Sequence, residues 1–587
     1  MNFFSVSQEN NQFLDLYLYM DSLYNRLINR YKNNSNSSSK ECIICVESGL
    51  IGKNEDRIFN QKDLIDRCNQ FIDDIKPLIS NQTIIPYFAL FMSNSFDSLC
   101  LLIALSALYK TVDQATGSET NCYCSTILMP PNLKRDEITT LMNRSKVSTI
   151  IIPNDIGINH DTFIQTTTTT TTTPSSSITT SKITLIYSNN RFSIYKTEYI
   201  MNRVGEVVAD EPTVCQLTSG STSPSSKISI RTWKSIIEEA EVVAKQLDYT
   251  AEDTILVNSA ISHSYGLVGG IVSSLLSESL IILPISLDHL YQIDNLSIDS
   301  NNNNNKLKVN IMFGVRSSYH WLAERVLLPR CLFESLEAST LRYAMCAGSM
   351  IPADLIVQLR SKTGIQLRSN YGTTETGTIT IDTTTTGNRS DDENDNVNVS
   401  SVGIRLGQLL PHFQYRLSST EINQDELLLK STCLSRGYIK DDHIELATDK
   451  ENWFHTKDHI TIASSKEDQQ INIFYYQNRI RYYKYKNNSN NNDVFDPVLI
   501  EKQLLVHFNN IISDIVLVED KIFKCYITLV NNNNQSNSND INSFKKSITL
   551  DIEQYISVHQ PLLTPITIVI EEILPYSPAG KLLLKYL

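Results

Sequence analysis

The sequence predicts an α/β protein with a large N-terminal domain of mostly parallel sheets, a strand-rich subdomain and a small α/β C-terminal domain. Three observations support this fold class. Short apolar segments alternate with amphipathic ones over roughly the first 300 residues, as strands and helices do in parallel sheets. Strand-like segments predominate after about residue 400. The last hundred or so residues return to the alternating pattern.

The alternating part of the chain is expected to begin with a strand that holds Cys42 and Cys45. Ile43 and Ile44 between them are β-branched, and no second cysteine pair follows at zinc-site distance, so a structural interpretation is favoured. Further strands are expected over 83–91, 124–129, 147–152 and 254–258. Helices are expected over 95–110, 132–144, 233–247 and 267–277.

The rest of the chain supplies the other two regions. The strand-rich region has candidate strands over 413–417, 426–429 and 471–474. The final block has candidate helices over 498–508 and 544–559 and candidate strands over 515–518, 524–530 and 565–569. Tracts of Asn, Ser or Thr separate these blocks and read as surface insertions. We therefore expect an N-terminal extension with a low-complexity end over 1–40, a large domain over 41–477 and a small domain over 478–587.

Composition excludes several classes of protein. The 587 residues carry a net charge of −13, which argues against nucleic acid as the main partner. The longest apolar run is about half of the roughly 20 residues that span a bilayer. Eleven cysteines are scattered along the chain, as expected of reduced thiols. Neither a signal peptide nor the usual peroxisomal address is apparent, so we expect a cytoplasmic protein with no transmembrane segment.

A glycine surrounded by hydroxyls is the first candidate site. The string is Thr218-Ser219-Gly220-Ser221-Thr222, and it follows an apolar strand-like segment. Small residues let a backbone approach an anion closely, and their N–H and O–H groups can then surround phosphate oxygens. The string therefore suggests a phosphate-binding loop, although such runs are often plain loops.

The second candidate site is the string from Asn370 to Gly377, which reads Asn-Tyr-Gly-Thr-Thr-Glu-Thr-Gly. It follows a strand-like segment. An aromatic ring, a glycine turn, two hydroxyls and a carboxylate can stack a base, hold a phosphate and bind a hard cation.

Taken together, these strings resemble the adenylate-forming superfamily, and the chain is most similar in pattern to acyl-CoA synthetases. Three weaker strings follow in the expected order: 453–458 (Trp-Phe-His-Thr-Lys-Asp), 478–479 (Asn-Arg) and 574–581 (Leu-Pro-Tyr-Ser-Pro-Ala-Gly-Lys). The resemblance implies a large N-terminal domain and a small, mobile C-terminal domain. It implies that a carboxylate attacks the α-phosphate of ATP, giving an acyl-adenylate and pyrophosphate. A thiol of coenzyme A or of a carrier protein then displaces AMP.

The resemblance also implies which residues bind the nucleotide. The loop from Thr218 to Thr222 would hold the β- and γ-phosphates. Gly348 and Ser349 would lie against the adenine. Tyr371 would stack on the adenine, with Gly372 beside it in the same turn.

A second group carries the roles closest to the reacting atoms. By the resemblance, Thr374 contacts the α-phosphate and Glu375 ligates Mg²⁺. Asp458 accepts hydrogen bonds from the ribose hydroxyls, and Arg479, just past the interdomain hinge, reaches the ribose or a phosphate. Lys581 bridges the substrate carboxylate and the α-phosphate, which reduces the repulsion between two anions.

His263 bears on the class of acid. It begins a His-x-x-Gly pattern, similar to that of acyl-CoA synthetases, whereas amino-acid-activating domains usually carry a Phe-Asp pair there. A fatty or aromatic carboxylate is therefore expected. The alternative for His263 is a histidine satisfied within the core.

The chain departs from the family pattern in two loops. The phosphate loop usually continues Gly-x-Pro-Lys, whereas residues 223–226 read Ser-Pro-Ser-Ser and the lysine comes one place late, at Lys227. After Arg479, residues 480–486 lack the usual glycine and run into an Asn tract.

These departures leave three alternatives open. The first is an AMP-forming acid–thiol ligase that uses coenzyme A. The second is an adenylating enzyme that loads a carrier protein in trans. The third is a nucleotide-binding pseudoenzyme. No Gly-x-Ser-x-Gly string supports a hydrolase.

Overall fold

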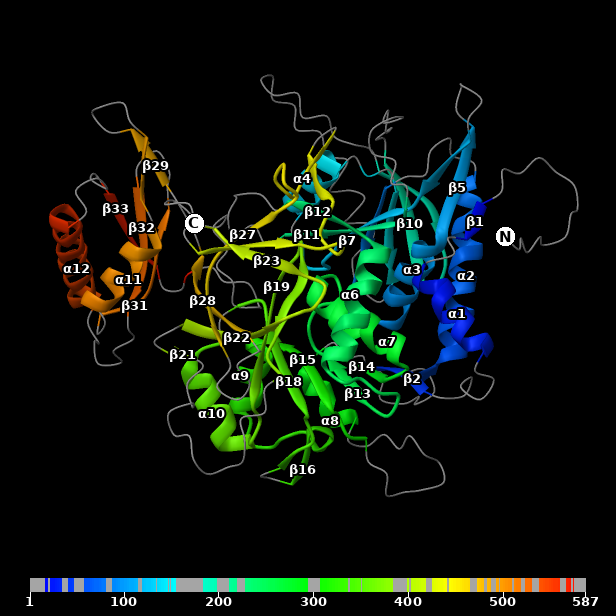
Figure 1. Ribbon diagram of the computed structural model, residues 1–587, viewed down its shortest axis with the longest axis horizontal. Coiled ribbons are helices and arrows are strands. Elements are labelled where there is room, and N and C mark those ends of the chain that lie inside the picture. Colours follow the sequence, from blue (N-terminus) through cyan, green and yellow to red (C-terminus); the bar gives the residue numbers. More distant parts are fainter. Residues whose placement is uncertain are drawn as a thin grey trace, which may run out of the picture.

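Two large sheets dominate the fold in the computed structural model of the chain (Figure 1). The low-complexity tracts fall almost wholly outside the described part. The structure describes residues 16–18, 22–33, 41–46, 58–80, 87–113, 119–133, 135–145, 147, 149–154, 183–197, 211–218, 227–284, 286–293, 307–335, 338–349, 351–383, 399–400, 403–418, 425–440, 443–464, 472–479, 483–486, 492–495, 497–508, 511–518, 523–529, 538–559, 566–571 and 574.

The first large sheet is parallel in its centre and antiparallel towards both edges. Its strand order is β26 (His443–Glu445), β25 (Gly437–Lys440), β12 (Ile228–Thr232), β11 (Thr213–Leu217), β7 (Ser125–Met129), β4 (Tyr87–Phe91), β8 (Thr149–Pro153), β10 (Phe192–Thr197) and β9 (Ile183–Ser188). The pairs β11–β7, β7–β4 and β4–β8 are parallel. This confirms the strands expected near 83–91, 124–129 and 147–152.

The second large sheet is also parallel in its centre and antiparallel towards both ends. Its order is β23 (Gln414–Leu417), β24 (Glu426–Lys430), β27 (Phe454–Ser464), β28 (Asn472–Arg479), β22 (Gly403–Leu409), β20 (Gly377–Ile381), β19 (Leu367–Thr373), β18 (Tyr343–Ala347), β15 (Ile311–Val315), β13 (Thr254–Val257), β14 (Leu280–Pro284), β2 (Glu41–Val46) and β3 (Ile58–Asn60), with β21 (Val399–Ser400) beside β22. Strands from β2 to β19 pair in parallel, and the β19–β20 pair is antiparallel.

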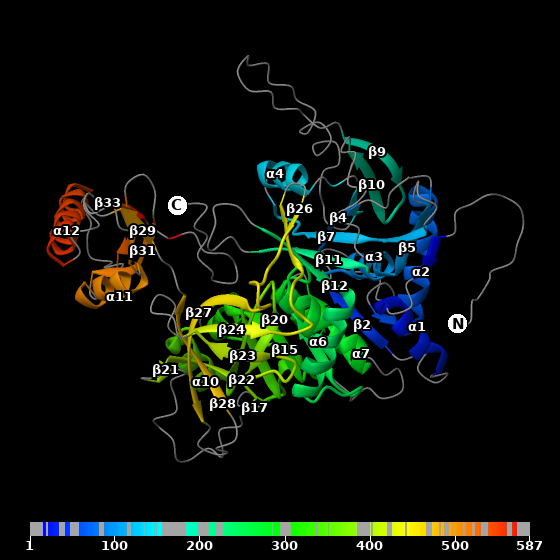
Figure 2. The ribbon, with the colours of Figure 1, turned by 45° about the horizontal axis from the view of Figure 1, so that its top comes forward.

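The main hydrophobic core joins both sheets through the helices that pack on them. Figure 2 shows the arrangement of these helices and sheets. It combines residues of β4, β13 and β15 with α3 (Phe96–Ala107), α6 (Trp233–Gln246) and the π-helix η3 (Tyr265–Val272). Leu23 and Leu27 of α1 (Leu23–Asn33) are buried in the same core, so this part of the expected N-terminal extension packs on the large domain.

Smaller elements complete the large part of the chain. The further helices are α2 (Gln61–Ser80), α4 (Arg135–Ser145), α7 (Ser273–Ser277), η4 (Leu287–His289), α8 (Leu290–Ile293), α9 (Arg316–Glu324), η5 (Arg330–Leu332) and α10 (Ala353–Thr363). The small sheets contain β1 (Leu16–Leu18), β5 (Leu108–Asp113) and β6 (Glu119–Tyr123), and β16 (Phe333–Ser335) with β17 (Ala338–Ser339).

Two helices differ from the sequence expectation. The helix expected over 95–110 begins as predicted, with Ser95 as its cap, but it ends at Ala107. The Tyr-Lys-Thr-Val stretch that follows forms β5, because it pairs with β1 and β6. The helix expected over 267–277 is π-helical up to Val272. Gly269 lies so close to the Phe313 ring that a Cβ there would collide with it, a constraint that periodicity does not encode.

The final block has a sheet and a hydrophobic core of its own (Figure 1). Its elements are β29 (Tyr483–Lys486), β30 (Asn492–Phe495), α11 (Pro497–His507), β31 (Ile512–Val518), β32 (Phe523–Leu529), α12 (Ser538–His559) and β33 (Ile566–Glu571). The domain boundary at 477/478 remains a prediction, because β28 pairs with β27 through Arg479.

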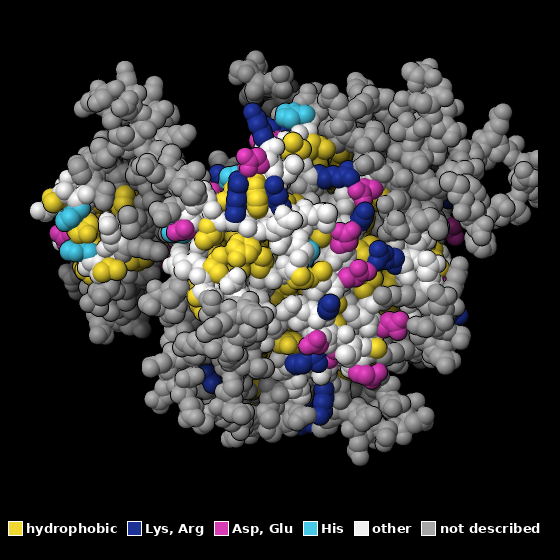
Figure 3. Space-filling model, in the orientation of Figure 1, with side chains coloured by type: hydrophobic (Ala, Val, Ile, Leu, Met, Phe, Trp, Pro, Cys, Tyr) yellow, Lys and Arg dark blue, Asp and Glu magenta, His cyan; other side chains and the backbone are white. Residues whose placement is uncertain are grey.

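The surface carries both signs of charge. On the face shown in Figure 3, Lys and Arg side chains of the described residues lie interspersed with Asp and Glu. None of the described helices combines the length and apolarity that a membrane span requires.

Candidate active site

The hairpin turn between β19 and β20 presents Thr374 and Glu375. Thr373 and Thr376 fix this turn, since the backbone N–H of each donates to the hydroxyl oxygen of the other, at 3.1 and 3.2 Å. Gly377 closes the turn at φ +68°, a conformation that favours glycine. Thr374 and Glu375 are half-buried. The second motif therefore folds into a braced turn at the point where the sheet stops being parallel.

A buried carboxylate lies beside this hairpin. The side chain of Asp458 is 4% exposed. Its Oδ2 accepts a hydrogen bond from the Tyr371 hydroxyl at 2.6 Å, and its Oδ1 accepts one from Nη1 of Arg479 at 2.9 Å. Asp458 and Arg479 face each other across the β27–β28 ladder. Three residues that are distant in the sequence therefore converge.

The protonation states within this cluster follow from burial and charge. Burial, followed by the charge of Asp458, raises the pKa of Tyr371 well above its ordinary value, so the phenol is neutral. Burial alone would lower the pKa of Arg479, but attraction to the carboxylate of Asp458 outweighs it and raises the pKa. The cluster thus pairs a guanidinium with a carboxylate, and a carboxylate has lone pairs left for further donors.

The hydroxyl loop begins at Thr218, after β11, and ends at Lys227, before β12. The backbone N–H of Thr218 donates to the carbonyl oxygen of Lys227 at 2.9 Å, and the N–H of Lys227 donates to the Thr218 hydroxyl at 3.1 Å. This pair closes the loop as a hairpin. Ser219, Gly220, Ser221 and Thr222 lie outside the described residues.

The side chain of Tyr438 contacts both Lys227 and Glu375. Its Nζ lies 4.5 Å from the ring centroid of Tyr438, within cation–π range. The hydroxyl of Tyr438 donates to Oε1 of Glu375 at 2.8 Å. Burial, followed by the charge of Glu375, raises the pKa of Tyr438, so the hydroxyl keeps its proton. The displaced lysine is therefore linked to the turn of the second motif.

Gly348 and Ser349 follow β18 beside the start of the second motif. Strand β18 pairs in parallel with β19, with Cys346 opposite Ser369, so the carboxyl ends of both strands meet at one edge. Gly348 is exposed and lies at φ +91°. The Ser349 hydroxyl oxygen is buried and has no hydrogen-bond partner among the described residues. Gly372 lies opposite Thr378 in the β19–β20 ladder.

His263 lies in the turn that leads into η3. Its side chain is exposed. The next residue, Ser264, accepts a hydrogen bond from Nη1 of Arg231 at 3.2 Å. The structure thus places the His-x-x-Gly pattern on a helix start, close to β12. Lys581 lies outside the described residues.

Three residues near this site belong to none of the sequence motifs: Tyr438, Arg231 and Glu239. Tyr438 is an aromatic residue on the short strand β25, which is unremarkable in a sequence. Arg231 is the better signal, because it lies in an otherwise apolar and hydroxylic strand, Ile-Ser-Ile-Arg-Thr. Its partner Glu239 lies on the buried face of α6. A charged residue in a buried strand pattern calls for a partner, but the sequence does not say which.

The site combines a hydroxyl loop after a buried strand, a Thr-Thr-Glu turn and a buried Asp–Arg pair. Nucleotide-binding α/β proteins carry sites at the carboxyl ends of parallel strands, and here the hydroxyl string and the Thr-Thr-Glu turn follow β11 and β19, each of which has a parallel partner. A family model described as AMP-binding enzyme matches residues 124–439, more than half of the 587 residues. The chain belongs to this family.

Individual relatives agree with this family. A 3,4-dihydroxybenzoate–[aryl-carrier protein] ligase of Bacillus anthracis is 25% identical over 225 residues, which cover 38% of this chain and 46% of that protein. The matched segment thus spans about half the length of this curated relative.

Solved structures extend the likeness to the whole chain. ATP-bound MatB of Rhodopseudomonas palustris has a TM-score of 0.57 at 12% identity, covering 96% of this chain and 97% of its own. The O-succinylbenzoate coenzyme A synthetase of Bacillus subtilis, in complex with AMP, has a TM-score of 0.58 at 15% identity, covering 95% and 96%. These likenesses concern the fold, and they confirm the expected two-domain α/β class.

Proposed function

We propose that the chain activates a carboxylic acid with ATP and then passes the acyl group to a thiol. A carboxylate oxygen attacks the α-phosphorus, the bond to the β-phosphate oxygen breaks, and pyrophosphate leaves. The thiol then attacks the acyl carbon and AMP leaves with the bridging oxygen. The observation that carries this proposal is the convergence of Tyr371, Asp458 and Arg479 beside the Glu375 turn.

The residues suit a nucleotide. Asp458 is a buried carboxylate that is already held by two donors, so it is oriented before any ribose hydroxyl arrives. Tyr371 would stack on the adenine, and the unpartnered hydroxyl of Ser349 suits a polar edge of the base. Arg479 would contact the ribose or a phosphate. Preorganised donors and acceptors of this kind lose little entropy on binding.

The residues also suit Mg²⁺ carried in with the phosphates. Glu375 offers a carboxylate with one oxygen bonded to Tyr438, which leaves the other for a cation. Among the described residues, no cluster of three or more His, Cys, Asp or Glu side chains could form a complete metal site. Mg²⁺ commonly uses one or two carboxylates plus substrate phosphates. When bound, the ion would neutralise phosphate charge.

Phosphate contacts are proposed for both motifs. Thr374 would contact the α-phosphate, while the loop from Thr218 to Thr222, together with Lys227, would hold the β- and γ-phosphates. Lys581 would bridge the carboxylate and the α-phosphate. Charge neutralisation and positioning dominate such chemistry.

The proposed substrate is a lipophilic acid, and aromatic acids are preferred to fatty acids as candidates. His263 begins the pattern that favours fatty or aromatic acids over amino acids. The Bacillus anthracis relative is named for an aryl acid, and one of the similar solved structures is an anthranilate CoA ligase with anthranoyl-AMP. Coenzyme A is the proposed acceptor. A carrier protein in trans is the second candidate, because the same relative is named for an aryl-carrier protein.

The experiment that tests this function is ATP–pyrophosphate exchange by the full chain with a panel of aliphatic, aromatic and amino acids. We expect exchange that depends on an aromatic or fatty acid and on Mg²⁺. The absence of exchange with every acid would refute the proposal and favour a nucleotide-binding pseudoenzyme. Adding coenzyme A to a reacting mixture separates the acceptors, since thioester formation identifies coenzyme A, whereas adenylate that accumulates unchanged points to a carrier.

A further inference from the structure

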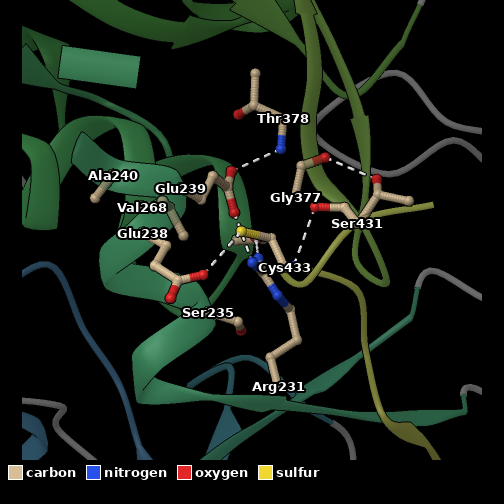
Figure 4. A network of polar contacts seen from close by, with 12 residues as sticks. Arg231, Ser235, Glu238, Glu239, Ala240, Val268, Gly377, Thr378, Ser431 and Cys433 are labelled. Atoms are coloured by element: carbon tan, nitrogen blue, oxygen red, sulfur yellow. Dashed lines mark hydrogen bonds and ion pairs between the residues drawn. The ribbon is translucent and has the colours of Figure 1, made fainter. Parts of the chain in front are cut away.

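A buried ion pair joins β12 to α6 beside the candidate active site. Nη2 of Arg231 lies 2.7 Å from Oε2 of Glu239, and the two side chains are 1% and 0% exposed. Thr232 follows Arg231 and caps α6, since its hydroxyl oxygen accepts from the N–H of Ser235 at 3.1 Å. The strand end and the helix therefore form one unit in which guanidinium faces carboxylate (Figure 4).

Glu239 also contacts the hairpin that carries Thr374 and Glu375. Its Oε1 accepts a hydrogen bond from the backbone N–H of Thr378 at 2.6 Å. A Cβ at Gly377 would collide with its Oε2. Figure 4 shows the carboxylate of Glu239 directed at this stretch of backbone. The turn therefore packs against the charged side chain of Glu239, which belongs to α6.

Arg231 contacts the segment that carries His263. Its Nη1 donates to the hydroxyl oxygen of Ser264 at 3.2 Å. On the neighbouring strand, Nε2 of Gln216 donates to the carbonyl oxygen of Ser262 at 3.0 Å. Residues 262–264 are therefore bonded by side chains of β11 and β12. The ion pair connects this segment to the Glu375 turn through two side chains.

Neighbouring titratable groups leave this charge balance undisturbed at neutral pH. Burial, followed by the positive charge of Arg231, lowers the pKa of His412 to about 4, so the imidazole is uncharged. Burial raises the pKa of the Cys433 thiol to about 11, so the thiol keeps its proton. Glu239 therefore supplies the counter-charge for Arg231.

Stability alone does not explain the pair. Two charges lose their hydration on burial, and well-packed apolar residues of similar size often stabilise a fold at least as well. The described structure gives Nε of Arg231 no hydrogen-bond partner. What apolar residues cannot reproduce are the contacts to the Thr378 N–H and to the Ser264 hydroxyl.

We propose that Arg231 and Glu239 are positioning residues that set the spacing between the Thr374–Glu375 turn and the His263 segment. This inference rests on the proposed function, in which the turn contacts the phosphates and the His263 segment helps to select the acid. The carboxylate oxygen must then meet the α-phosphorus, and a misplacement of about 1 Å can cost on the order of 100-fold in rate.

The test compares the wild type with R231M, E239M and the double variant R231M/E239M. Each single variant leaves one buried charge unpaired, so its melting temperature should fall, and the double variant should recover most of that loss. The positioning role predicts that acid-dependent exchange in the double variant stays at least tenfold below wild type. It also predicts at least tenfold faster deuterium uptake in peptides that cover 373–379, because the Thr378 amide has lost its acceptor.

Two further variants sharpen the comparison. E238Q is the matched control, because Glu238 lies one residue away on α6 and contacts Thr432 and Cys433 instead. Its exchange rate should stay within twofold of wild type. R231K keeps a charge for Glu239 but lacks the second arm that reaches Ser264. It should fold and lose at least fivefold in kcat with little change in the KM for ATP, and a kcat within twofold of wild type would contradict the role.

The outcomes separate this inference from the proposed function. A double variant with a recovered melting temperature, a wild-type exchange rate and wild-type deuterium uptake would overturn the positioning role. If the wild type itself catalyses no acid-dependent exchange, the proposed function fails. Deuterium uptake then decides the inference alone, since faster uptake at 373–379 supports it and unchanged uptake overturns it.

Discussion

Replacing Asp458 by Asn should weaken the binding of Mg·ATP while leaving the fold in place. Asn has the same shape as Asp, so Tyr371 can still donate to its carbonyl oxygen. The charge opposite Arg479 disappears, however, and so does the charge-assisted character of any hydrogen bond from a ribose hydroxyl. Because Asp458 is almost completely buried, water does not compensate for this loss.

The size of the effect follows from the hydrogen bonds involved. A hydrogen bond to a charged group contributes roughly 1.5–3 kcal/mol, against roughly 0.5–1.5 kcal/mol for a neutral pair. Two ribose hydroxyls that change from one class to the other lose roughly 2–3 kcal/mol together. This corresponds to a roughly 30- to 150-fold higher dissociation constant for Mg·ATP.

Isothermal titration calorimetry of Mg·ATP binding to the folded full chain measures this constant. D425N is the matched control, because Asp425 lies in the turn just before β24, pairs with His459 at 3.6 Å and has a positive φ, which Asn tolerates. Its dissociation constant should stay within twofold of wild type. If D458N bound Mg·ATP within threefold of wild type, the assignment of Asp458 to the ribose would be wrong.

Three other predictions concern separate residues. Y438F keeps the ring under Lys227 but frees Glu375, so half-maximal exchange should need about tenfold more Mg²⁺; an unchanged Mg²⁺ titration would contradict the link. K581A should abolish exchange, and wild-type exchange would refute its role. The pKa of His412, about 4 in the folded chain, lies below its unfolded value, so the unfolded chain takes up the proton first and stability falls as pH drops from 6.5 towards 4. H412Q should remove up to roughly 3 kcal/mol of this loss in denaturant unfolding, and an identical pH profile would contradict the burial argument.

Local patterns were enough to predict most elements of the fold. The helix expected at 233–247 starts at Trp233 after its Thr232 cap, and the Cys-Ile-Ile-Cys string forms part of β2. Element ends were harder, because they depend on distant partners. The helix over 96–107 ends at Ala107 because the next residues pair with β1 and β6. No residue near Ala107 indicates this pairing.

The candidate site could be predicted where its residues are close together in the sequence. The strings around Thr218, Tyr371 and Asp458 could be recognised by their residue types and order. The fold brings Tyr371 and Asp458 together. Tyr438 and Glu239 were missed because their roles depend on strand pairing and helix packing across more than a hundred residues. Arg231 was missed as well, although a charged residue in a strand of apolar and hydroxyl residues is unusual, and its partner cannot be identified from the sequence.

The most direct test of the central claim follows the oxygen atoms. The full chain is incubated with Mg·ATP, coenzyme A and the best acid from the exchange panel, labelled with ¹⁸O in its carboxylate. Acyl-adenylate formation predicts one labelled oxygen in the AMP released and none in the pyrophosphate. Unlabelled AMP, or no AMP formed in the presence of the acid, would contradict the account.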